Sequence, residues 1–101
     1  MTQPKLIWSL RSLTEYEQLL SYLMKEWGEL ITKRVAERIN DQINRIQNAP
    51  EQFPLIVKSK NIRRCVVSSQ TSIFFRVNIN RIELLSIFDN RQDPKKRSFL
   101  T

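Results

Sequence analysis

The spacing of apolar residues changes once along this chain, and that change constrains the fold more than any other feature of the sequence. Up to residue 46 apolar side chains recur every three or four positions, which is the period of an α-helix packed on one side. From residue 62 they follow the two-residue alternation of β-strands. The pattern predicts an α+β protein, with helices followed by a sheet.

The helical part is predicted to be an antiparallel two-helix hairpin. Overlapping capping-box patterns at residues 12–15 and 14–17 indicate the first helix start, Gly28 marks its end, and a second helix ends before Pro50. The first helix is expected to face the core with Leu13, Tyr16, Leu19, Leu20, Leu23 and Trp27. The second is expected to do so with Ile31, Val35, Ile39, Ile43 and Ile46.

The remaining elements are predicted strands. A short strand over Lys5 to Ser9 precedes the helices, and three more follow them at residues 62–69, 72–79 and 82–88. The last three are joined by two-residue turns, so they are expected to form a three-stranded antiparallel meander. The helices are predicted to pack on one face of this sheet and to leave the other face open and basic.

Length and composition place the chain in one class. Its 101 residues allow a single domain over residues 1–101, and a single glycine argues against a flexible chain. Cys65 is the only cysteine and there is no histidine, so typical zinc sites and Ser-His or Cys-His catalysis are excluded, and no metal or cofactor is expected. The sequence shows no secretion signal and no long apolar run, which favours a cytoplasmic protein without a membrane segment.

The charge is concentrated in the second half. Of the net +7, residues 1–50 carry +1 (seven Lys/Arg, six Asp/Glu) and residues 51–101 carry +6 (ten and four). This excess of positive charge in one half of the chain favours polyanions or an acidic protein as partners. The tail, about residues 93–101, is basic and is expected to be loosely held unless Phe99 and Leu100 dock. The charges of the second helix, Glu37 and Asp41 among its arginines, are interpreted as a solvated face linked by salt bridges.

The candidate binding residues are cations of the predicted sheet and its loops. Strand alternation allows only one of Arg63 and Arg64 to lie on the open face. Arg76 is expected either to contact phosphate or an acidic partner, or to pair with Asp89 or Glu83. The full candidate set is Lys58, Lys60, Arg63, Arg64, Arg76, Arg81 and Arg91. Asp89, Asn90 and Asp93 are interpreted as turn or cap residues rather than metal ligands.

With these elements in this order, the sequence resembles RelE/ParE toxins of type II toxin–antitoxin systems, of the plasmid-stabilisation type. The segments that carry the resemblance span nearly the whole chain: WSLRSLTEYEQLLSYLMKEWG, AERINDQINRIQNAP, FPLIVKSKNIRRCVV, SIFFRVN and IELLSIFDNRQDPKK. The resemblance implies a growth inhibitor that is neutralised in a hetero-oligomer with its cognate antitoxin. An acidic antitoxin would complement the basic second half. The target would be DNA gyrase, as for ParE-like members, or the ribosome and its mRNA, as for RelE-like members.

The ribonuclease branch of this superfamily implies a site of lysines before the meander, arginines on the sheet, and a late tyrosine or histidine. The matching cations here are Lys58, Lys60, Arg64, Arg76 and Arg91, which are catalytic only if the chain is a metal-independent, ribosome-dependent endoribonuclease. Neither tyrosine nor histidine follows Phe88. We therefore favour gyrase inhibition, with mRNA cleavage as the alternative and a non-toxic, basic nucleic-acid-binding module as a second alternative.

Overall fold

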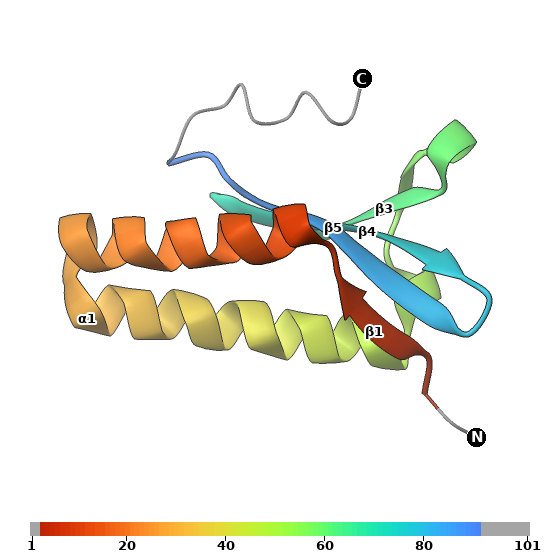
Figure 1. The fold of residues 1–101 in the computed structure, drawn as a ribbon, viewed down its shortest axis with the longest axis horizontal. Coiled ribbons are helices and arrows are strands. Elements are labelled where there is room, and N and C mark those ends of the chain that lie inside the picture. Colours follow the sequence, from red (N-terminus) through yellow and green to blue (C-terminus); the bar gives the residue numbers. More distant parts are fainter. Residues whose placement is uncertain (1–2, 92–101) are drawn as a thin grey trace.

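The computed structural model describes residues 3–91, which form a helical layer against a five-stranded mixed sheet (Figure 1). The elements are β1 (Lys5–Trp8), α1 (Leu10–Asn48), η1 (Pro50–Gln52), β2 (Leu55–Val57), η2 (Lys58–Lys60), β3 (Ile62–Val66), β4 (Thr71–Asn78) and β5 (Arg81–Asp89). The predicted α+β class is confirmed. The predicted tail at 93–101 lies outside the described residues. No helix within residues 3–91 has the length and apolar character needed to cross a membrane.

The helix α1 begins three residues earlier than the capping boxes predicted. Ser9 has extended geometry (φ −66°, ψ 158°), and its Oγ accepts a hydrogen bond from the backbone N–H of Ser12 at 3.0 Å. This contact satisfies one of the amide groups that a helix leaves unpaired in its first turn. The predicted cap residue Ser12 is therefore inside the helix, where its side chain is buried.

The helical part is one element of 39 residues, so the prediction of two separate helices is wrong. The chain leaves helical geometry at one residue only, Gly28, whose φ of 86° and ψ of 175° are accessible to glycine at little cost. The parts of α1 before and after Gly28 run side by side (Figure 1); we call them the first arm and the second arm. A single glycine thus reverses the direction of the chain within α1.

The first arm packs on the core through a face that overlaps only partly with the predicted one, to which Tyr16, Leu19 and Leu23 contribute as predicted. Its buried residues are Ser12, Glu15, Leu19 and Leu23, whereas Leu13 and Trp27 are exposed. The polar residue Glu15 is buried because its carboxylate accepts hydrogen bonds from β5. In the second arm Ile39, Ile43 and Ile46 are buried as predicted, while Ile31 and Val35 are half-buried.

The sheet is mixed and has five strands in the order β1-β5-β4-β3-β2, so the prediction of a sheet formed only by a three-stranded antiparallel meander is wrong. Antiparallel pairs join β3 to β4 and β4 to β5, as the short turns require. Leu55–Val57, where no strand was predicted, form β2 at one edge. At the other edge β1 pairs in parallel with β5, because α1 returns the chain to the sheet between them.

A β-bulge in β5 sets which side chains reach the helical layer. Phe74 pairs with Ser86 but Phe75 pairs with Leu84, which leaves Leu85 as the extra residue. The main core lies between the sheet and α1. A second, smaller cluster occupies the opposite face of the sheet, where Ile62, Phe74 and Phe88 are buried beside Val57 and Leu85. The face expected to be open and basic therefore has an apolar centre.

Candidate functional site

The five predicted catalytic cations do not converge on one site. Lys58 and Lys60 lie in the 3-10 turn between β2 and β3, Arg64 lies on β3, and Arg76 lies on β4. Arg91 follows the end of β5, next to the start of β4, where Thr71 pairs with Asp89. Arg64 pairs with Phe74 and Arg76 with Ile62, which places these two arginines on the same face of the sheet, whereas Arg91 lines a separate cleft.

Arg76 is paired with an acidic residue directly across the sheet. Its register partner on β5 is Glu83, and the Nη2 to Oε2 distance is 3.4 Å. Glu83 also accepts hydrogen bonds from Asn78 and from Arg81. Of the partners proposed for Arg76 from sequence, Glu83 is the one the fold places opposite it.

The adjacent arginines of β3 point to opposite faces, as strand alternation predicted. Arg63 donates from Nη1 to the backbone carbonyl of Phe53 at 2.7 Å and so anchors the segment before β2. Arg64 lies on the other face, where its Nε donates to Ser72 Oγ at 3.2 Å. A small cavity of about 110 Å³ adjoins Arg64 and is also lined by Phe74 and Phe88.

Arg91 is held by Asp89 in a two-pronged ion pair. Its Nε donates to Oδ1 at 2.9 Å and its Nη2 to Oδ2 at 2.6 Å, while its backbone N–H also donates to Oδ1 at 3.0 Å. Thr71 Oγ1 donates to Oδ2 at 2.6 Å. Asp89 is fully buried, so these donors compensate for the water that its carboxylate loses. Asp89 was expected to act as a turn residue, and in the structure it also holds the side chain of Arg91 in place.

The electrostatics of this pair follow from its contacts. Burial acts to raise the pKa of Asp89, but hydrogen bonds from Arg91 and Thr71 outweigh it and lower the pKa below the ordinary 3.8. The hydrogen bond to Asp89 in turn raises the pKa of Arg91. Both groups are therefore charged at neutral pH, and the guanidinium is oriented before any ligand arrives.

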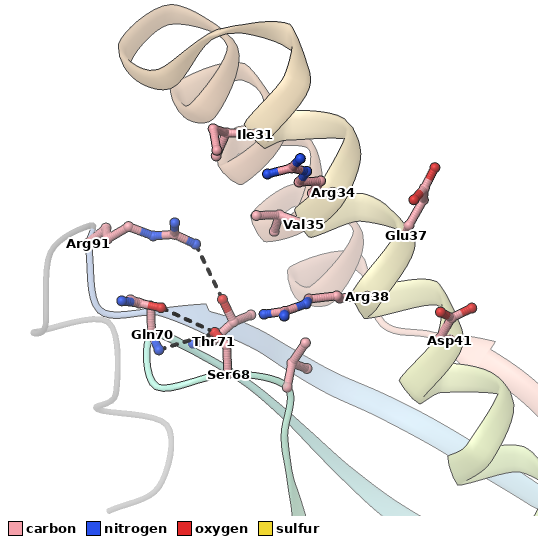
Figure 2. Close-up of a pocket in the computed structure, with 11 residues that line it drawn as sticks. Ile31, Arg34, Val35, Glu37, Arg38, Asp41, Ser68, Gln70, Thr71 and Arg91 are labelled. Carbon is pink, nitrogen blue, oxygen red and sulfur yellow. Dashed lines mark hydrogen bonds between the residues drawn. The ribbon is translucent and has the colours of Figure 1, made fainter.

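Arg91 forms one wall of a cleft between the second arm of α1 and the β3–β4 turn, with a volume of about 420 Å³ (Figure 2). Arg34 and Arg38 lie on the opposite wall, one helical turn apart. The polar side chains of Ser68, Gln70 and Thr71 line its base, and Ile31, Val35 and Val67 add apolar surface. We call this the arginine cleft.

The contribution of α1 to this cleft does not follow from the predicted role of its charges. The charge pattern predicts a solvated face linked by salt bridges, but among residues 3–91 neither Arg34 nor Arg38 has an ion-pair partner. Glu37 and Asp41 lie at the outer rim (Figure 2). The available signal was the four-residue spacing of the two arginines beside Val35, which places all three on one side of a helix.

The chemistry open to the cleft is recognition of carboxylates or phosphates. Guanidinium groups bind such oxygens through two parallel hydrogen bonds, and two of the three here have no acidic partner in the described part of the chain. Within residues 3–91 no cluster of His, Cys, Asp or Glu side chains is arranged to hold a metal ion. Cys65 lies in the main core, where burial raises the pKa of its thiol to about 11.

Comparisons with known proteins agree with this architecture. The family model for the ParE toxin of the type II toxin–antitoxin system parDE matches residues 6–94. A solved structure from a chromosomal ParDE system of Pseudomonas aeruginosa superposes with a TM-score of 0.74 at 17% identity, covering 86% of this chain and 96% of that one. The structure of a YoeB/ParE toxin from Agrobacterium tumefaciens superposes with a TM-score of 0.61 at 22% identity, covering 84% of this chain and 97% of that one. The structure of a conserved hypothetical protein of Helicobacter pylori superposes with a TM-score of 0.55 at 16% identity, covering 88% of this chain and 97% of that one. No curated protein matches the sequence.

Proposed function

This chain belongs to the ParE toxin family of type II toxin–antitoxin systems, and we propose that it arrests growth by inhibiting DNA gyrase rather than by cleaving mRNA. Membership in the family establishes a toxin of the RelE/ParE superfamily and implies an antitoxin partner. The choice of target rests on one observation, which is how the five predicted catalytic cations are distributed.

Cleavage of RNA without a metal needs a group that activates the 2′-hydroxyl, a group that protonates the leaving oxygen, and cations free to stabilise the developing charge. Here Arg76 and Arg91 are each bound to a carboxylate. The tyrosines Tyr16 and Tyr22 belong to α1 and pack against the core. These positions favour a toxin that acts by binding, which is the ParE-like mode.

A gyrase supercoiling assay with purified toxin tests this proposal. We expect inhibition by a stoichiometric excess of toxin and its reversal by the cognate antitoxin. In parallel, primer extension on translated messages during induction of the toxin reports on the ribonuclease alternative. Full supercoiling activity in the presence of excess toxin, or ribosome A-site cuts that appear on induction, would contradict the proposal.

The arginine cleft supports a further part of the same function. We propose that an acidic segment of the antitoxin binds there, with its carboxylates at Arg34 and Arg38. Arg91 is already neutralised by Asp89, so it orients the wall of the cleft while the two α1 arginines supply the unpaired charge. Such contacts would make affinity fall as salt is added, since charge pairs near a surface are screened.

The test of the cleft compares two charge-reversal pairs. The variant Arg34→Glu/Arg38→Glu changes the cleft, whereas Lys25→Glu/Lys33→Glu makes the same change of net charge at exposed positions outside it. Isothermal titration with the cognate antitoxin should show at least about tenfold weaker binding for the first pair only. The cognate antitoxin is to be sought as a short acidic open reading frame immediately upstream. An equal loss for both pairs would contradict the assignment of the cleft.

A further inference from the structure

A row of large apolar side chains runs along the solvent side of the first arm of α1. Leu10 is 82% exposed, Leu13 43%, Met24 51% and Trp27 54%. Leu20, between them, is half-buried. The first arm packs on the sheet through Ser12, Glu15, Leu19 and Leu23, so the fold leaves this second apolar face without a partner among the described residues.

The spacing within the row is that of a coiled-coil seam. Together with Glu17 these residues stand at positions 10, 13, 17, 20, 24 and 27, alternating by three and four along the chain. Apolar residues at this spacing are the knobs through which one helix packs into the holes of another. The row spans roughly 25 Å at 1.5 Å per residue, and it stops where Gly28 leaves helical geometry. We call it the α1 seam.

Glu17 decides what kind of helix the seam accepts. Its side chain is exposed and has no ion-pair partner within residues 3–91. If a second copy packed on the seam in parallel, Glu17 would face Glu17. If it packed antiparallel in register, Glu17 would face Leu13, Leu20 or Trp27. Either arrangement removes a carboxylate from water without compensation, which disfavours association of this chain with itself.

From this geometry we propose that the α1 seam docks an amphipathic helix of a different protein. That helix carries apolar residues at heptad spacing and a lysine or arginine opposite Glu17. A basic residue there would form an ion pair with Glu17 and so compensate its carboxylate for the water lost on docking. Polar residues at such positions of a helix pair determine which partner binds and in which register.

The experiment uses the full-length toxin and a synthetic helical peptide of about three heptads, with leucine at the seam positions and lysine opposite Glu17. Isothermal titration should give one peptide per chain. Replacing the peptide's lysine by glutamate should weaken binding about tenfold or more, and the toxin variant Glu17→Lys should reverse this preference.

Two toxin variants separate the seam from non-specific adhesion of apolar surface. Met24→Lys is expected to weaken binding of the lysine peptide about tenfold, because a methionine that the bound peptide would cover is replaced by a charge. Ile79→Lys changes an apolar residue at the β4–β5 turn that is even more exposed, 92% against 51% for Met24, and should leave binding unchanged. Glu17, Met24 and Ile79 are all exposed, so the circular dichroism spectra and melting curves of the three toxin variants should match those of the wild type.

Three results would overturn the proposal. The first is no binding of either peptide, and the second is binding that ignores the charge swap at Glu17. The third is self-association of the toxin, seen by sedimentation, that is abolished by Met24→Lys, since the seam would then be an interface between two copies. None of these results bears on the gyrase proposal, which is tested without the peptide.

Discussion

Glu15 in α1 accepts a hydrogen bond from Ser86 Oγ of β5 at 2.6 Å, and this contact joins the helical layer to the sheet at its β-bulge. The same carboxylate oxygen accepts the backbone N–H of Ile87 at 3.2 Å. β1 pairs with β5 only as far as Leu84, so the backbone N–H groups that follow on this edge of β5 need another partner. Glu15 supplies that partner, which explains why a glutamate is buried where an apolar residue would be expected.

The variant Glu15→Ala should therefore be strongly destabilised. It leaves two buried donors without acceptors, and at about 1–3 kcal/mol for each the free energy of unfolding should fall by roughly 3 kcal/mol. Glu15→Gln retains an acceptor oxygen and should lose less. Urea denaturation measures both, with the exposed Glu17→Ala as the control. Equal losses for Glu15→Ala and Glu17→Ala would contradict the role given to Glu15.

The Asp89–Arg91 pair makes stability depend on pH in a defined direction. The pKa of Asp89 is lower in the folded protein than its ordinary value of 3.8, so the unfolded chain binds a proton more readily. The contribution of Asp89 is then fully present above pH 4–5 and is lost as the pH falls through the folded pKa. Asp89→Asn should lower the free energy of unfolding by about 2 kcal/mol or more at pH 7. The difference between wild type and variant should shrink in acid-denaturation curves below about pH 4. A difference that grows on acidification would contradict this assignment.

Gly28 should resist substitution for a reason confined to the backbone. A methyl group at this position meets no atom within 4 Å, but φ of 86° with ψ of 175° is a conformation that side-chain-bearing residues rarely adopt. Gly28→Ala is expected to reduce the melting temperature, with a loss of about 1–3 kcal/mol in the free energy of unfolding. Ala36→Gly in the second arm is the comparison for an ordinary helical site and should cost about 1 kcal/mol. A stabilised Gly28→Ala protein would show that the reversal tolerates another conformation.

Cys65 should be chemically inert in the folded protein. Burial raises the pKa of its thiol to about 11, so at pH 8 roughly one thiol in a thousand is ionised, and none is exposed to reagent. Iodoacetamide at pH 8 should therefore label the protein only after denaturant unfolds it, which mass spectrometry reports directly. Rapid labelling under native conditions would indicate that β3 opens readily.

Much of the architecture was predictable because local chemistry specifies it. The periods of 3.6 and 2 assigned the helical and strand regions, and the alternation within β3 correctly separated Arg63 from Arg64. The position of Gly28 as the end of the first helical run was also visible, since glycine is the residue that tolerates its backbone angles. These features depend on neighbours in the chain, so the sequence contains them.

Other features depended on contacts between residues far apart in the chain. The parallel pairing of β1 with β5 and the addition of β2 follow from where α1 returns the chain. The predicted buried face of the first arm was right for Leu19 and Leu23 but omitted Glu15, which is favourable there only once Ser86 and Ile87 are beside it. With Ser12 and Glu15 turned toward the sheet, Leu13 and Trp27 lie on the solvent side of the first arm, where they form part of the α1 seam.

The charges divide in the same way. The sequence by itself determined that the chain is basic and which half carries most of the excess. Only the tertiary structure decided which cations are available, because it placed Glu83 opposite Arg76 and Asp89 beside Arg91 while bringing Arg34 and Arg38 to the same cleft. The physical reason is that a charge acts through its distance to other charges, and for residues tens of positions apart that distance is set by the fold.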